Sequence, residues 1–274
     1  MNSFTSGLYI VSTPIGNLDD ITLRSLNVLK NSDIILCEDT RRTLKICNHF
    51  KIRKKLISYH KFNERKELSK ILEYLKTGMK IALVSDAGTP LISDPGNLLI
   101  NECIKENIQI IPIPGASSIT SAFSVSGFED KFLFYGFLPK TEFQLKKTIS
   151  TLKDLNYSLI FFLPGLKINF YLKVFKDYFP NRNILIAREI TKIHETFYRG
   201  EVNSIEYFKK TLKGEITVVI SKKNNKDQIN DSQIKDMAKI LIKKNSLKDV
   251  VNKIHLKEGV AKKRIYKICL QIKK

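Results

Sequence analysis

Residues 80–96 of the chain, KIALVSDAGTPLISDPG, decide the fold class. The apolar run Ile81–Val84 has the length of a buried strand. The small-residue loop Ser85–Pro90 is expected to end this strand, because Gly88 can take backbone angles closed to other residues and Pro90 cannot donate to a sheet. We therefore expect a buried strand followed by a tight loop, as in an open α/β sheet.

A second break, Ser93–Gly96, follows this loop and predicts the start of a helix. Ser93 or Asp94 would cap that helix, with Pro95 at its first position. In open α/β sheets, ligands bind in the crevice at the carboxyl ends of the strands. The stretch therefore predicts a ligand-binding loop; the alternative is a strand-to-helix connection that binds nothing.

The composition indicates the class of protein. A length of 274 residues predicts about two domains. A net charge of +20, from 47 Lys and Arg against 27 Asp and Glu, indicates a polyanionic partner, unless the whole proteome is lysine-rich. The four scattered cysteines match neither a zinc pattern nor a disulfide framework, so we expect reduced thiols in the cytoplasm and no metal site. With no signal peptide pattern and no apolar run of membrane-spanning length, we expect no membrane partner.

Strand and helix patterns alternate along residues 1–127 and predict an N-terminal α/β domain with a mostly parallel sheet. The expected strands are 8–11, 33–36, 56–58, 81–84 and 108–113, and the expected helices are 21–30, 64–76 and 116–126. Residues 128–221 predict a second α/β domain. Its expected strands are 132–135, 158–163, 184–187 and 216–220, residues 195–200 would form one arm of a hairpin, and its expected helices are 143–152, 166–179 and 205–210.

Residues 222–274 predict a small basic helical appendage. A polar linker, 222–236, precedes short helical patterns, and this part holds 16 Lys or Arg against 5 Asp or Glu, a net charge of +11. Such a concentration of charge fits nucleic-acid binding. The alternatives are a merely solvated appendage, or one that packs its apolar residues onto the second domain. Those apolar residues are Val250, Ile254, Ile265 and Ile268.

Three small-residue loops follow expected parallel strands of the first domain, and all would lie on one edge of its sheet. Glycines let a ligand approach the backbone closely, and N–H groups at helix starts hold anionic groups. None of the loops is a G-x-G-x-x-G fingerprint or a P-loop. Together they predict a small, polar, nucleoside-like ligand held by Pro14, Gly16, Ser85, Asp86, Gly88, Thr89, Pro90, Pro114, Gly115, Ala116, Ser117 and Ser118.

Two polar clusters are candidates for the substrate side of this site. Residues 40–62 hold eight basic residues and no acid, directly after Glu38 and Asp39, so they would present phosphate contacts beside a reactive group. Residues 187–195 form a dense polar cluster that would line a cleft between the domains. The alternatives are a solvated helix for the first cluster and structural ion pairs for the second.

Seven motifs carry a family resemblance. They are LYIVSTPIGNLDDIT, EDTRRT, ALVSDAGTPLISDPG, PIPGASSI, GFLPK, AREITKIHET and KGEITVVI, in this order. Over residues 7–221 the chain resembles the bacterial 16S rRNA (cytidine-2′-O)-methyltransferase I family of the tetrapyrrole (corrin/porphyrin) methylase superfamily. The resemblance implies two α/β domains of the tetrapyrrole methylase type, S-adenosyl-L-methionine in the cleft between them, and a homodimer. It also implies methylation of the ribose 2′-hydroxyl of a decoding-centre cytidine on the small ribosomal subunit.

One departure concerns the cleft wall. The family usually carries a Y-E-S-P-H-R-like motif where this chain has Phe162–Lys167, FLPGLK, so the glutamate and arginine are missing. The expected donor site still includes Phe162 and Ala187. The expected substrate contacts are Asn17, Arg41, Arg42, Lys45 and Lys192.

A ribose hydroxyl becomes a good nucleophile only as it loses its proton, so a general base would help. Glu38, Asp39 and Glu189 are the candidates, and the sequence does not choose among them. Two other functions stay open. One is a methyltransferase of a tetrapyrrole precursor, and the other is a catalytically inactive RNA-binding assembly factor.

Overall fold

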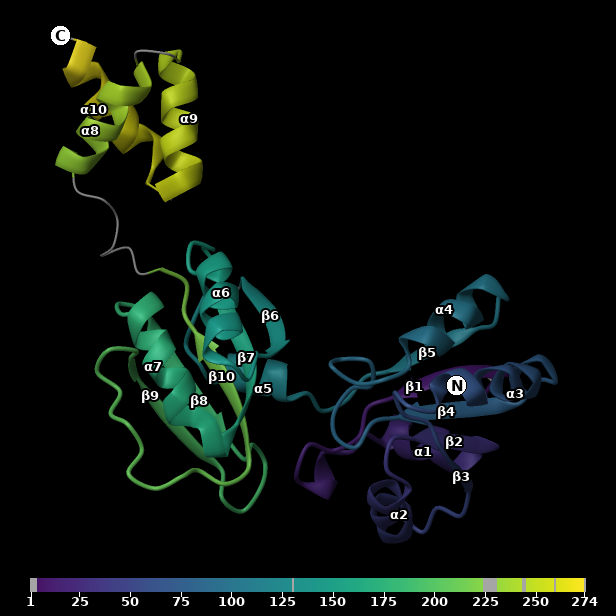
Figure 1. Cartoon of the computed structure of the whole chain (residues 1–274). Coiled ribbons are helices and arrows are strands. Elements are labelled where there is room, and N and C mark those ends of the chain that lie inside the picture. Colours follow the sequence, from purple (N-terminus) through teal and green to yellow (C-terminus); the bar gives the residue numbers. More distant parts are fainter. Residues whose placement is uncertain (1–3, 130, 224–230, 243–244, 259, 274) are drawn as a thin grey trace.

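The structure, a computed structural model, describes residues 4–129, 131–223, 231–242, 245–258 and 260–273. These residues form two five-stranded sheets with helices, followed by three C-terminal helices (Figure 1). Within the described residues, no helix is both long and apolar enough to cross a membrane.

The first sheet has the strand order β3-β2-β4-β1-β5, and all its neighbouring strands are parallel. The strands are β1 (Gly7–Val11), β2 (Ile34–Cys37), β3 (Lys55–Ser58), β4 (Lys80–Val84) and β5 (Ile110–Ile113). The helices of this unit are η1 (Leu18–Asp20), α1 (Leu23–Asn31), α2 (Thr40–His49), α3 (Glu64–Lys76), α4 (Asn97–Lys105) and α5 (Ser118–Ser124).

Both faces of the first sheet are buried, which explains why its central strands are continuous apolar runs. Successive side chains of a strand point to opposite faces. Leu8 and Ile10 of β1 accordingly pack with residues of α3 and α4, whereas Tyr9 and Val11 pack with residues of α1 and α2. The predicted parallel sheet is present.

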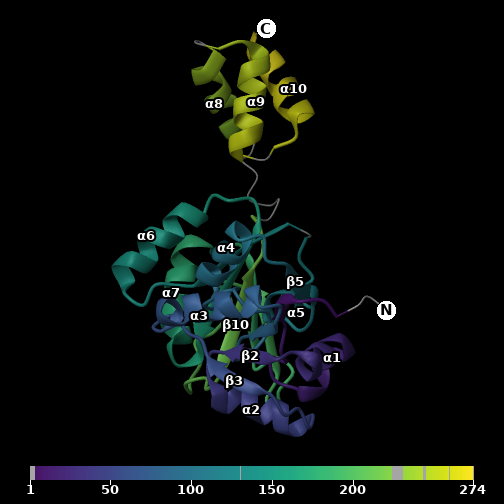
Figure 2. The ribbon, with the colours of Figure 1, turned by 90° about the vertical axis from the view of Figure 1, so that its right-hand side faces the viewer.

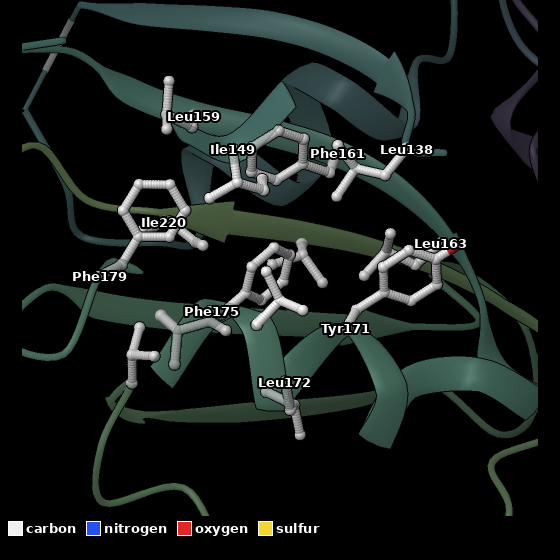
Figure 3. Close-up of a cluster of buried hydrophobic side chains, with 14 of the residues drawn as sticks. Leu138, Ile149, Leu159, Phe161, Leu163, Tyr171, Leu172, Phe175, Phe179 and Ile220 are labelled. Atoms are coloured by element: carbon white, nitrogen blue, oxygen red, sulfur yellow. The ribbon is translucent and has the colours of Figure 1, made fainter. Parts of the chain in front are cut away.

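The second sheet has the order β6-β7-β10-β8-β9, in which only the β6–β7 pair is parallel. Its strands are β6 (Phe132–Phe137), β7 (Ser158–Pro164), β8 (Asn183–Arg188), β9 (Thr196–Glu201) and β10 (Glu215–Ile220). The helices α6 (Glu142–Leu152) and α7 (Ile168–Tyr178) cover one face, and the short η2 (Gly165–Lys167) precedes α7. Phe161 of β7, Phe175 of α7 and Phe179, which follows α7, lie in the core between the sheet and these helices (Figure 3).

The other face of the second sheet packs against α5 and the β1–α1 loop of the first unit. Ile119 and Ala122 of α5 and Ile15 of the β1–α1 loop pack with apolar side chains of β7, β8 and β10. Buried apolar contact therefore joins the two units at the carboxyl ends of β1 and β5.

The three C-terminal helices are α8 (Asp231–Ile242), α9 (Leu247–Glu258) and α10 (Lys262–Lys273), and they form a core of their own. Val250, Ile254, Ile265 and Ile268 are buried in this core, so the alternative in which they pack onto the second sheet is wrong. Both views show the three helices set apart from the two sheets (Figures 1 and 2). Of the expected linker 222–236, residues from Asp231 onward belong to α8, and residues 224–230 lie outside the described residues.

Two local predictions are wrong. The helix after the second break begins at Asn97, and its N-cap is Gly96, not Ser93 or Asp94. Ser93 instead has a left-handed backbone with φ of 70°.

The expected helix 205–210 is absent from the described chain, because tertiary hydrogen bonds fix this segment. The Phe208 N–H donates to Asn169 Oδ1 at 2.9 Å, and Asn169 Nδ2 donates to the Phe208 carbonyl at 2.9 Å.

Candidate active site

The three small-residue loops meet at one edge of the first sheet. Thr13 and Gly88 exchange backbone hydrogen bonds of 2.9 and 3.0 Å. The Ser12 and Thr89 hydroxyls lie 3.0 Å apart, and the Thr89 hydroxyl also donates to the Ala116 carbonyl at 3.4 Å. The loops come together because β4, β1 and β5 are parallel neighbours, so their carboxyl ends share an edge.

Two glycines of these loops serve close packing rather than an approach to open space. A Cβ on Gly115 would lie 2.8 Å from Ser12 Cβ, and one on Gly16 would lie 2.4 Å from Lys192 Cγ. Gly88 is different, because its φ of +80° strains any other residue. The glycines thus hold the loops against one another and against the second unit.

A cavity of about 740 Å³ lies between the two units, a size typical of ligand and cofactor sites. The predicted site residues that line it are Arg42, Asp86, Gly88, Thr89, Ser117, Ser118, Phe162, Ala187 and Lys192. Gly16, Asn17, Glu189 and Lys192 line a second hollow. The remaining predicted residues line neither: Pro14, Glu38, Asp39, Arg41, Lys45, Ser85, Pro90, Pro114, Gly115 and Ala116.

Asp86 and Asp94 make one end of this cavity acidic. Asp86 accepts a hydrogen bond from the Asp39 N–H at 3.0 Å and pairs with Arg42 at 3.4 Å. Burial, together with the charges of Glu38 and Asp86, raises the pKa of Asp94 to about 6, although the Ser85 hydroxyl acts in the opposite direction. Sequence reasoning treated Asp94 only as a helix cap and missed it as a site residue.

The three carboxylates proposed as bases have different surroundings. Burial and the neighbouring Asp86 raise the pKa of Glu38. Asp39 caps α2 by accepting from the Arg41 N–H at 2.9 Å, and its side chain also pairs with the Arg41 guanidinium at 2.7 Å. Hydrogen bonds from Arg41 lower the pKa of Asp39 to about 2.

Glu189 is held by two hydrogen bonds to its carboxylate. The Glu215 N–H donates to it at 2.9 Å, and Lys192 Nζ donates at 3.0 Å. Burial works to raise the pKa of Glu189, but these hydrogen bonds outweigh burial and lower it. Lys192 is thereby fixed between Glu189 and Glu215, with its Nζ 2.9 Å from Glu215 Oε2.

The departure from the family motif gives the cavity an apolar wall. Phe162, Leu163 and Pro164 line it, where the motif would bring a glutamate. Below them the Tyr171 side chain is fully buried at the cavity wall, and its hydroxyl has no partner among the described residues. The side chains that line this wall are apolar, so it fits a ligand with an apolar ring.

Comparison with known proteins shows the family to which the chain is similar. The family model described as Tetrapyrrole (Corrin/Porphyrin) Methylases matches residues 7–206. The chain is 46% identical over 224 residues to the ribosomal RNA small subunit methyltransferase I of Mesomycoplasma conjunctivae, an alignment that covers 81% of this chain and 94% of that relative. It is 42% identical over 271 residues to the protein of the same name from Rickettsia prowazekii, with 96% of each chain covered.

Solved structures are similar in fold. The crystal structure of the methyltransferase CobJ matches with a TM-score of 0.60 at 17% identity, over 79% of this chain and 94% of that one.

Proposed function

The chain belongs to the tetrapyrrole (corrin/porphyrin) methylase family and, within it, to the ribosomal RNA small subunit methyltransferase I family, and from this membership we propose that it methylates small-subunit ribosomal RNA with S-adenosyl-L-methionine as donor. The observation that carries the proposal is the cavity between the units. The converging loops, three carboxylates and an apolar wall surround a space of cofactor size.

The donor fits the residues of this cavity. Phe162 and Ala187 would hold the apolar part of the donor, and Gly88 and Ser117 would leave room for its polar parts. Asp86, Thr89 and Ser118 are the further proposed donor contacts, because they line the cavity. The other predicted residues would act by shaping the loops; they are Pro14, Gly16, Ser85, Pro90, Pro114, Gly115 and Ala116. When bound, the donor supplies a methyl group activated by its sulfonium. The task of the protein is then mainly to orient that methyl group toward the acceptor oxygen.

We propose the ribose 2′-hydroxyl of a decoding-centre cytidine in 16S rRNA as the acceptor. The ribose oxygen would take the methyl group that the donor supplies, with S-adenosyl-L-homocysteine as the leaving group, and the hydroxyl proton would pass to a carboxylate. Asp94 lines the cavity and Glu38 lies in the same acidic group, so these two are the proposed acceptors of the proton.

The basic residues around the cavity are proposed to hold RNA phosphates. Asp39 orients Arg41, while Glu189 orients Lys192, so both acids act through the cations they pair with. Arg42, Lys45 and Asn17 are the further proposed RNA contacts. Phosphate contacts of this kind fix the position of RNA without reading its sequence.

Three further points are part of the proposal. The protein would act as a homodimer in the cytoplasm. Its domains would be residues 1–127, 128–221 and 222–274, which follow the two sheets and the C-terminal helices. The small ribosomal subunit would be the partner that carries the target.

The test is to map 2′-O-methylation on 16S rRNA from cells with and without this protein, and to repeat it with purified protein, small subunits and donor. One decoding-centre cytidine should lose its methyl group in cells without the protein and regain it in vitro. Unchanged maps would contradict the proposal. RNA binding without donor binding would favour an assembly factor, and binding of a tetrapyrrole without RNA would favour the small-molecule enzyme.

A further inference from the structure

A β-bulge in β6 determines which way Phe137 faces. Phe134 pairs with Ile160 and Gly136 pairs with Phe161, so Tyr135 is an extra residue in the strand. Side chains three positions apart in a regular strand point to opposite faces. The extra residue cancels one alternation, and Phe134 and Phe137 therefore both lie on the same face of the sheet.

Ring contacts confirm that these side chains share a face. The Phe162 ring centroid lies 4.9 Å from that of Phe134 and 5.4 Å from that of Phe137, both in edge-to-face geometry. Gly136 makes the bulge possible, because its φ is +89° and a Cβ there would lie 3.1 Å from Ser93 Oγ. The bulge is thus built against the loop of the first unit that carries Asp94.

Phe137 combines exposure with a position in the cavity wall. It is 63% exposed although it lines the cavity, and Lys140, Arg42 and Asp94 line the same cavity. Exposure alone means little, since Phe143 is 79% exposed without lining the cavity. What distinguishes Phe137 is an exposed side chain that lines a site with cations and carboxylates around it.

We propose that the open face of Phe137 is a stacking platform for one unstacked nucleobase of the RNA substrate; this rests on the proposed function. A ribose hydroxyl reaches the carboxylate end of the cavity only when its nucleotide leaves the helical stack, and a displaced base then needs a new partner. Aromatic rings supply this partner in single-stranded RNA recognition. Phe162 packs against the Phe137 ring and is itself packed by Phe134, and Lys140 and Arg42 offer charge for the neighbouring phosphates.

The test compares variants of the full chain in two assays. Binding of a short single-stranded oligocytidylate is measured at fixed salt, and KM and kcat are measured for methylation of small ribosomal subunits. Phe137→Ala should weaken RNA binding and raise KM about tenfold, a size within the range of base–aromatic stacking. Phe137→Trp should retain both values because it keeps a ring face, and Phe137→Leu should recover only a small part.

Phe143→Ala is the matched control, because it removes an exposed phenylalanine of the same unit outside the cavity. It should leave RNA binding unchanged. Donor affinity, measured by calorimetry, should stay within about twofold of wild type in Phe143→Ala, and in Phe137→Ala it should fall by clearly less than the RNA affinity does.

Three outcomes would overturn the platform. They are wild-type RNA affinity in Phe137→Ala, full recovery in Phe137→Leu, and a loss of donor affinity that matches the loss of RNA affinity. If the wild-type protein methylates subunits and Phe137→Ala does so equally well, the platform alone fails. If the wild-type protein neither binds nor methylates RNA, the proposed function fails with it.

Discussion

Asp86 and Asp94 lie in the wall of one cavity, but their partners give the two carboxyl groups different chemistry. Asp86 is engaged by the Arg42 guanidinium and the Asp39 N–H. Asp94 lies on a segment where Leu91 and Ser93 have left-handed backbones, with φ of 73° and 70°. Such strain in residues other than glycine persists only where surrounding structure supports it, and it concentrates at functional sites.

Asp94→Asn should slow methylation by about two to four powers of ten, the usual contribution of a general base. Because the base must be ionised, the wild-type rate should fall as the pH drops below about 6, the pKa to which burial raises this carboxyl group. The residual rate of Asp94→Asn should lack this acidic limb. The measurement is a pH profile of kcat at saturating donor. An unchanged limb in the variant would assign it to another group, with Glu38 as the first alternative.

The raised pKa of Asp94 should also make the free energy of unfolding depend on pH. The pKa of Asp94 is raised from 3.8 to about 6 on folding, so between these values the folded state binds more protons than the unfolded state. Stability from this group is therefore lost as the pH rises through about 6. Asp94→Asn should raise the thermal midpoint relative to wild type at pH 7.5 more than at pH 4. A difference of the opposite sign would contradict the burial of this side chain.

A substitution at Gly16 tests the close contact between the β1–α1 loop and the second unit. A Cβ at this position would lie 2.4 Å from Lys192 Cγ and 2.9 Å from the Ile190 carbonyl oxygen. Gly16→Ala should therefore push the loop away from the second unit and weaken donor binding about tenfold, or 1.4 kcal/mol. Calorimetry measures the donor affinity.

The control is Gly78→Ala, where the backbone has φ of +89° but no atom lies within 4 Å of the added Cβ. It should cost about 1 kcal/mol of stability through backbone strain and leave donor affinity unchanged. Equal effects of both substitutions on donor binding would mean that the contact with the second unit is not what matters.

At the scale of elements, the sequence predicts most strands and helices because each has a strong local signal. The helix α3 runs over Glu64–Lys76, the range expected from its apolar spacing. The helix expected at 205–210 fails, because Asn169, remote in sequence, supplies the hydrogen bonds of Phe208. The predicted start of α4 is wrong for a related reason, because Ser93 lies close to Gly136 of the second unit. Local patterns carry no information about such distant partners.

Helix α2 is the element that should contribute most to phosphate binding near the cavity. Arg41 and Lys45 are exposed on it. The double variant Arg41→Ala, Lys45→Ala should reduce the slope of log affinity against log salt by up to about two, one for each lost phosphate contact. Because Asp39 already neutralises Arg41 in part, a reduction nearer one is also consistent.

The matched control for this helix is Arg65→Ala with Lys66→Ala, on α3. Helix α3 packs on the opposite face of the first sheet from α2, and both residues are exposed. This pair should leave the salt slope unchanged. An equal change in both double variants would mean that overall charge, not α2, sets the affinity.

At the scale of the whole molecule, only part of the candidate site could be predicted from the sequence. The three loops could be predicted because glycine, proline and serine mark them after buried strands. The wall formed by Phe137, Leu163 and Tyr171 could not, because these residues pass for ordinary core positions until the second sheet is placed against the first. A cavity between two units depends on how the units pack, and the sequence pattern of a single segment does not predict that packing.

The separate core of α8–α10 leads to the last prediction, that deleting residues 224–274 leaves a folded, donor-binding protein. The cut preserves the ion pairs of Lys222 with Glu129 and of Lys223 with Asp154, and it removes no residue that lines the cavity. The deletion removes much of the net charge of +11 carried by residues 222–274. Affinity for small subunits should therefore fall about tenfold or more, or at least 1.4 kcal/mol. Donor affinity and the thermal midpoint of the truncated protein, measured by calorimetry, should match those of the full chain.

Full affinity for subunits after truncation would show that the basic helices do not bind RNA, and loss of donor binding would show that they support the cleft.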